Sequence, residues 1–191
     1  MGDTAAFTDH ALVFLRAVIG IVFGVAALPK TARLREFADT VGVLTGLGPR
    51  TARPTAIAVV LIELGIAGLT LDDGYPLVAA FAAGAALLAA YCVIIGSAVL
   101  RRTQVRCNCF GGSAEVVSGI HVLRNLVLLA CALTGLALAV LHRDSGARLS
   151  VEAIAADVLC AGVLAVVLVH IEALALLVGP DRTPNSNRGN G

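Results

Sequence analysis

Five long stretches of apolar residues constrain the fold of this chain more than any other feature. Each is about 18 residues or longer, which is close to the length that a helix needs to cross the hydrocarbon layer of a bilayer. Short polar segments with charged residues, glycine or proline separate them. The sequence therefore predicts an all-α fold, a polytopic transmembrane helical bundle, with spans over about residues 11–29, 54–71, 76–100, 116–141 and 151–178.

The composition agrees with a membrane location, since 58% of the 191 residues are hydrophobic and 14% are charged. The formal net charge of +1 gives no basic surface, so the lipid bilayer is expected as a partner and nucleic acid is not. We expect residues 1–178 to form the bundle in a bacterial-type plasma membrane. Residues 179–191, rich in Pro, Asn, Arg and Gly, are predicted to be a disordered tail.

Two smaller patterns concern the packing of the helices. Gly20 and Gly24 have the G-x-x-x-G spacing that lets another helix approach closely, although chance gives the same spacing in a chain rich in Gly and Ala. In the polar connection 30–53, apolar residues recur at helical spacing. This pattern predicts a short amphipathic helix lying at the membrane surface.

The connection between the third and fourth spans holds a candidate redox site, Cys107 and Cys109, with one residue between them. Thiols in a short polar segment are open to chemistry, whereas thiols inside apolar helices are usually inert. Two glycines follow and allow the tight turn that brings both sulfurs together, and the charge of Arg106 favours the reactive thiolate. A disulfide in so small a ring is strained, and strained disulfides are the redox-active ones.

Other interpretations of this CxC pair stay open. The two thiols can be half of a site for Cu(I) or Zn(II) that His121 completes, or they can have no role. A metal site would make the protein a metal-handling or small-solute membrane transporter, with charges inside the membrane as its pathway. A third class is a non-catalytic membrane scaffold or chaperone, in which the thiols only tether a partner enzyme.

Ionisable residues inside the apolar runs are a second candidate site, because each costs about 2.5–3.5 kcal/mol on insertion scales and is normally paired or functional. Counting residues at about 1.5 Å of rise places a set of them at one level beneath the cysteine loop: Glu63, Arg124, Asn125, His170 and, one turn nearer the cysteines, His121. Either Glu63 and Arg124 form a structural ion pair, or the cluster passes protons or positions an electron acceptor. Arg16 and Asp157 form a second predicted pair near the opposite face.

The loop charges predict an orientation. The face that carries the cysteine loop has ten Lys and Arg residues, and the other face has two. The positive-inside rule then places the cysteine loop in the cytoplasm and the N-terminus outside.

Several of these features together resemble the MauE/DoxX-like family of redox-associated membrane proteins. The matching residues cover about 11–141 and are Pro29-Lys30, Pro54, Glu63-Leu64-Gly65, Cys107-Asn108-Cys109-Phe110-Gly111 and Arg124-Asn125. The family loop commonly reads Cys-Gly-Cys-Phe-Gly, so Asn108 is a mild departure. The family core has four helices, which makes the fifth span here a C-terminal extension.

The resemblance implies a redox partner of thioredoxin-like proteins, and the chemistry that we predict is thiol–disulfide oxidoreduction. A quinone is the acceptor suggested by analogy with other membrane disulfide enzymes. The residues predicted to act are Cys107, Cys109, Arg106, Glu63, His121 and Arg124, with Asn125 and His170 predicted to bind the acceptor. The methylamine-utilisation member of the family implies maturation of a disulfide-containing enzyme such as methylamine dehydrogenase. That role implies an outer face for the cysteine loop, against the charge count.

Overall fold

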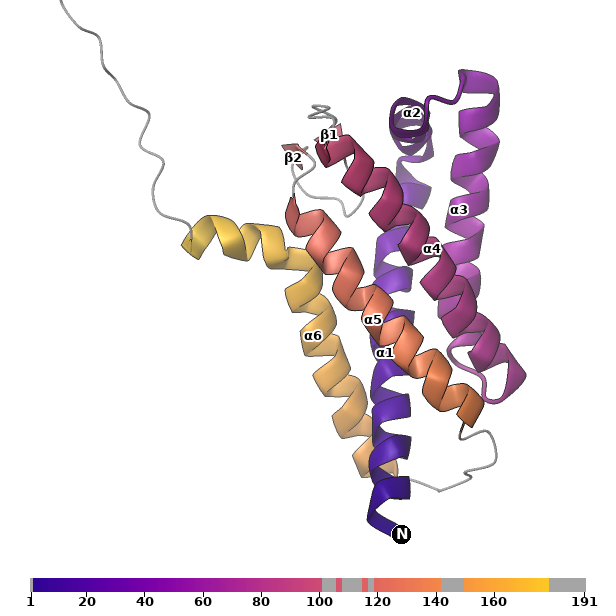
Figure 1. Ribbon diagram of the computed structural model, residues 1–191, viewed down its shortest axis with the longest axis vertical. Coiled ribbons are helices and arrows are strands. Elements are labelled where there is room, and N and C mark those ends of the chain that lie inside the picture. The colour runs from indigo at the N-terminus through magenta and orange to yellow at the C-terminus, as the bar shows by residue number, and fades with distance from the viewer. Residues whose placement is uncertain (1, 101–105, 108–114, 117–118, 142–149, 179–191) are drawn as a thin grey trace, which may run out of the picture.

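The structure, a computed structural model, describes residues 2–100, 106–107, 115–116, 119–141 and 150–178, and the side chains of 6–100, 119–141 and 150–169. The described residues form six helices: α1 (Gly2–Ala32), α2 (Leu34–Thr45), α3 (Pro49–Leu69), α4 (Tyr75–Leu100), α5 (Gly119–Leu141) and α6 (Val151–Val178). Between α4 and α5, the short strands β1 (Arg106–Cys107) and β2 (Glu115–Val116) pair in antiparallel fashion. Figure 1 shows this strand pair and α2 at one end of the bundle, and the N-terminus at the other.

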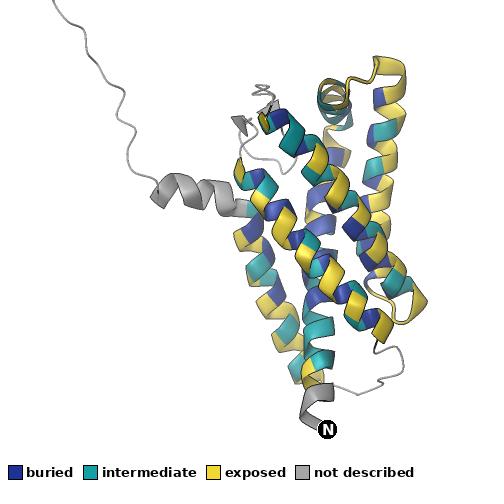
Figure 2. Cartoon of the chain, viewed as in Figure 1, coloured by how far each residue is buried: buried dark blue, intermediate teal, exposed yellow. Residues whose placement is uncertain are grey.

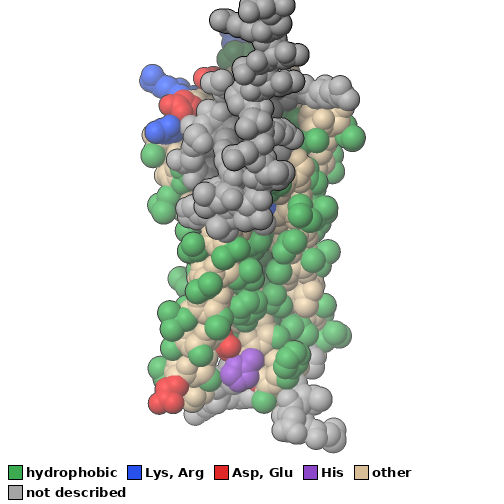
Figure 3. Space-filling model, turned by 90° about the vertical axis from the view of Figure 1, so that its left-hand side faces the viewer, with side chains coloured by type: hydrophobic (Ala, Val, Ile, Leu, Met, Phe, Trp, Pro, Cys, Tyr) green, Lys and Arg blue, Asp and Glu red, His purple; other side chains and the backbone are tan. Residues whose placement is uncertain are grey.

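Five of the described helices (all but α2) are long and apolar enough to cross a membrane, which confirms the predicted polytopic helical fold. Large apolar side chains are exposed along their outer faces, for example Leu61, Val93 and Leu159 at 63%, 71% and 70%. Figure 3 shows that hydrophobic side chains cover the middle of one face and that charged side chains gather towards its two ends. A bilayer covers such a belt, so the chain is a multi-pass membrane protein.

Helix α1 lies at the centre of the bundle and packs against α3, α4, α5 and α6 (Figure 1). Val18 and Ile19, near its middle, are completely buried. In Figure 2 the buried residues lie on the helix faces that meet inside the bundle. Because α1 contacts these four helices, its polar side chains are placed where other helices can supply partners.

Close packing at small residues fixes how the helices meet. A Cβ atom on Gly135 of α5 would lie 2.3 Å from the ring of Phe81 in α4, so this ring rests on bare backbone. A Cβ atom on Gly20 of α1 would lie 2.4 Å from Thr70 Oγ1, just after α3, and Gly24 also faces α3. Both glycines of the G-x-x-x-G spacing in α1 therefore lie where this helix meets α3 or the residue after it, and Gly20 makes the closer approach.

Helix α2 is the amphipathic helix predicted within 30–53. It packs against α3 and buries Ala38 on its inner side, while residues such as Arg35 stay exposed. The helix ends at Gly46, whose φ of 74° lies in the left-handed region that glycine adopts without strain. This turn lets the chain reverse into α3, so that α2 lies across the end of the bundle.

Candidate functional site

Lys30 is buried in the last turn of α1, with its side chain only 3% exposed. Assigning Lys30 to the start of the polar loop was wrong, because Pro29 does not end the helix. The carbonyl of Pro29 accepts the N–H of Arg33 at 3.0 Å, so α1 continues to Ala32. The Lys30 side chain is thereby directed into the bundle, where its ammonium group forms an ion pair with the carboxylate of Glu63 in α3.

Tyr91 of α4 and Phe37 of α2 complete the surroundings of this ion pair. The Tyr91 hydroxyl donates a hydrogen bond to Glu63 Oε1 at 2.6 Å, and Lys30 Nζ lies 3.4 Å from Tyr91 Oη. The same Nζ lies 5.3 Å from the centre of the Phe37 ring and 5.2 Å from that of Tyr91, within the range of cation–π attraction. Three helices thus stabilise the buried ammonium group of α1, with one carboxylate and two aromatic rings.

The cluster lines a partly open cavity of about 40 Å³ between the helices. Its polar lining consists of Lys30, Glu63, Tyr91, Arg124 and Asn125, and the remaining lining residues are apolar. Arg124 and Asn125 are 3% and 4% exposed, and His121 is buried one turn earlier in α5. The structure therefore brings together Glu63, Arg124 and Asn125, which the residue count had placed at one level.

The volume of the cavity decides what it can hold. Water needs roughly 10–15 Å³ of such space, so there is room for about three molecules, whereas a cavity that takes up benzene is nearer to about 150 Å³. The described space beside the cluster is therefore of the size for a few water molecules and smaller than that for an aromatic ring. Within the described residues, Glu63 Oε2 is buried and has no hydrogen-bond partner, although Oε1 has two.

The predicted cysteine site lies mostly outside the described residues. The backbones of Arg106 and Cys107 are described in β1, where Arg106 pairs with Val116 and Cys107 with Glu115. Their side chains, all of Cys109 and the side chain of His170 lie outside the described part of the chain. Their roles stay predictions. Among the described residues no group of three His, Cys, Asp or Glu could hold a metal ion.

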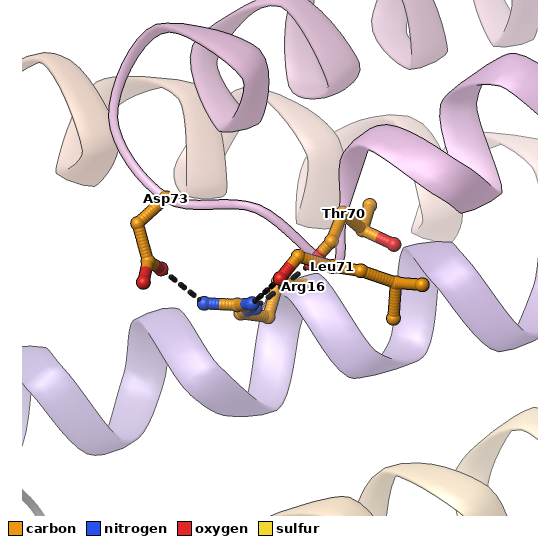
Figure 4. Close-up of polar contacts among 4 residues, drawn as sticks. All are labelled: Arg16, Thr70, Leu71 and Asp73. Carbon is orange, nitrogen blue, oxygen red and sulfur yellow. Dashed lines mark hydrogen bonds and ion pairs between the residues drawn. The ribbon is translucent and has the colours of Figure 1, made fainter.

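The predicted ion pair between Arg16 and Asp157 is wrong. Arg16 instead contacts Asp73 at 2.5 Å, and its other nitrogens donate 2.9 Å hydrogen bonds to the carbonyls of Thr70 and Leu71 (Figure 4). Asp157 Oδ2 lies 2.8 Å from His10 Nδ1. Counting along a helix gives the level of a residue but not the direction of its side chain, and Arg16 points towards the turn between α3 and α4.

Sequence reasoning missed Lys30 and Tyr91 as members of the buried cluster. Tyr91 is one of only two tyrosines and lies within an apolar span. A buried tyrosine hydroxyl usually finds a hydrogen-bond partner, so its position was a usable signal. Lys30 gave a weaker sequence signal, because a lysine after a proline at the end of an apolar run is typical of a loop.

The fold and the cluster define a class of protein: a multi-pass helical membrane protein with a buried ionic cluster and a CxC sequence between two spans. The chain belongs to the MauE family, since the family model described as "Methylamine utilisation protein MauE" matches residues 8–138. The match runs from α1 into α5, and α6 follows it.

Among curated proteins, the "Methylamine utilization protein MauE" of Paracoccus denitrificans is 40% identical over 133 residues, which is 66% of this chain and 70% of that protein. No solved structure matches the chain significantly.

Proposed function

We propose that this protein is a membrane thiol–disulfide redox protein that exchanges with a thioredoxin-like partner through Cys107 and Cys109. The observation that carries the proposal is the CxC sequence itself, which lies within the residues matched by the family and in the connection between α4 and α5. The register of β1 with β2 supports it, because pairing Cys107 with Glu115 places the backbone of one cysteine of the pair in a short strand pair at the end of the bundle (Figure 1). A soluble partner can reach residues at the end of a bundle.

The exchange is balanced without a further reactant. A thiolate of the reduced partner attacks the Cys107–Cys109 disulfide, so one S–S bond breaks and a mixed disulfide forms. The second thiolate of the partner then attacks the mixed disulfide and releases the membrane protein with both thiols reduced. Two electrons and two protons have passed from the partner to the CxC pair, and the reverse reaction oxidises the partner.

The relative named for methylamine utilization supports a role in the same process. We propose that the exchange serves the maturation of a disulfide-containing enzyme such as methylamine dehydrogenase. A thioredoxin-like protein would carry the disulfides between the membrane protein and that enzyme.

The test uses the full chain in a background where Cys92, Cys131 and Cys160 are replaced by serine. All three are free thiols in the spans, so their loss leaves the proposed site intact. The oxidised protein is mixed with a reduced thioredoxin-like protein, and the thiols are counted by a maleimide that shifts mobility on a gel. We expect two new thiols per chain. When either Cys107 or Cys109 is changed to serine, the reduced variant is mixed with the oxidised thioredoxin-like protein instead, and the remaining thiolate should attack the partner's disulfide to give a mixed disulfide and one free partner thiol.

Undiminished exchange in both single variants would overturn the proposal. So would a stoichiometric soft metal on the purified protein that both variants lose, because that result supports metal handling instead. The matched control is the background itself, which keeps Cys107 and Cys109 and lacks only the three cysteines that have no part in the proposed exchange.

A further inference from the structure

The two oxygens of Glu63 differ in what they contact. Oε1 accepts hydrogen bonds from the Lys30 ammonium group and the Tyr91 hydroxyl. Oε2 is buried and accepts none from the described residues. A buried carboxylate oxygen without a donor is costly, so water in the adjoining cavity is its expected partner.

A second, smaller cavity of about 10 Å³ lies on the surface side of the cluster, between α1 and α2. Arg33 and Glu36 line it, and their side chains are 60% and 62% exposed, so this cavity is next to solvent. It has room for about one water molecule. Two residues, Lys30 and Phe37, line both cavities and form the wall between them.

We infer that Glu63 is a proton-exchange site inside the membrane, reached from solvent at the α2 end through the wall formed by Lys30 and Phe37. A proton from water enters by the surface cavity, crosses this wall and is bound by the Glu63 carboxylate, which becomes a neutral carboxylic acid. On release the same proton returns to water. This inference does not depend on the proposed thiol exchange.

The aromatic rings give the site a way to hold a proton. When Glu63 is neutral, the charge of Lys30 loses its counterion, but the Phe37 and Tyr91 rings still attract the ammonium group. The charged or titratable groups around the cavity are Lys30 from α1, Tyr91 from α4 and Arg124 from α5, while the α2 residue that lines it, Phe37, is uncharged. Lys30 and Tyr91 are therefore positioning residues for the Glu63 carboxylate.

Infrared difference spectroscopy of the full chain in lipid tests this inference. The spectrum at low pH minus that at neutral pH should show the C=O band of a carboxylic acid that is missing in Glu63→Gln. If Glu63→Gln does not fold, the double variant Lys30→Met/Glu63→Gln is the reference, since it lacks both charges. The band should shift in D2O. Identical difference spectra for wild type and reference, at every pH at which both are folded, would overturn the inference.

A second measurement tests the route. Phe37→Ala joins the two cavities, so the band of Glu63 should shift in D2O severalfold faster than in wild type. The matched control is Phe7→Ala, because Phe7 is 76% exposed on α1, outside the lining of both cavities. An unchanged rate in Phe37→Ala, or an equal acceleration in Phe7→Ala, would show that protons do not pass this wall.

Discussion

Replacing Lys30 by methionine is the most informative perturbation of the buried cluster. Methionine keeps a long unbranched side chain and removes the charge, so Glu63 stays in the bundle without its counterion. The Glu63 side chain is 1% exposed, so bulk water cannot replace the lysine. Removing one partner of a buried pair typically costs about 3–5 kcal/mol.

The cost has a ceiling, because the folded variant can bind a proton at Glu63 instead of keeping a bare charge. An ordinary glutamate has a pKa of about 4.3, so keeping the group neutral at pH 7 costs about 3.7 kcal/mol of unfolding free energy. The folded variant then carries a proton that the unfolded chain lacks above that pKa. Stability is therefore regained as the pH falls, at about 1.4 kcal/mol per pH unit towards pH 5.

Removing the other partner of the ion pair gives the opposite dependence of stability on pH. Glu63→Gln leaves the Lys30 ammonium group unpaired, and an ordinary lysine has a pKa of about 10.4, so keeping it neutral at pH 7 costs at most about 4.6 kcal/mol. This variant should become more stable as the pH rises. The double variant, which buries neither charge, should lie near wild type at every pH.

Guanidinium unfolding in a neutral detergent at several pH values measures the free energy of unfolding of all three variants. Together with wild type they form a double-mutant cycle, which gives the interaction energy between Lys30 and Glu63. Arg33→Met is the matched control, because Arg33 forms a 3.7 Å ion pair with Glu36 on the exposed surface. Such an exposed pair contributes about 0.2–1 kcal/mol. The reasoning is refuted if Lys30→Met is equally stable at pH 7 and pH 5, or if the double variant loses the sum of the two single losses.

Three further predictions concern packing and orientation. Gly135→Ala should lower stability by about 1–3 kcal/mol, because the new methyl group overlaps the Phe81 ring. Gly162→Ala on α6, with open space around it, should be neutral or slightly stabilising in a thermal melt. Equal effects of the two substitutions would contradict the packing described. Arg16→Met should destabilise the protein clearly more than Asp73→Asn, because the Asp73 side chain is 87% exposed and Arg16 donates two hydrogen bonds to backbone carbonyls. Equal losses of stability in the same melt would show that the exposed ion pair is the main contact. The charge asymmetry predicts that a membrane-impermeant maleimide labels the CxC cysteines only after cells are opened, and labelling in intact cells would place the loop outside, as the family resemblance implies.

The sequence by itself determined the architecture of the membrane part. The five spans follow from apolar length, because transfer of each segment into a bilayer depends on its own residues and not on its neighbours. The level of Glu63, Arg124 and Asn125 also follows from the sequence, because a helix rises by a constant amount per residue. These three residues do line one cavity.

Only the tertiary structure decided which charged groups meet. Lys30 forms an ion pair with Glu63 because α1 continues past Pro29. Arg16 contacts Asp73 because the α3–α4 turn lies beside it. Both outcomes depend on the direction in which a side chain leaves its helix and on which helix lies there. The side-chain direction and the neighbouring helix depend on packing at sites such as Gly20 and Gly135, which brings together residues far apart in the sequence. They therefore cannot be read from any single segment of the chain.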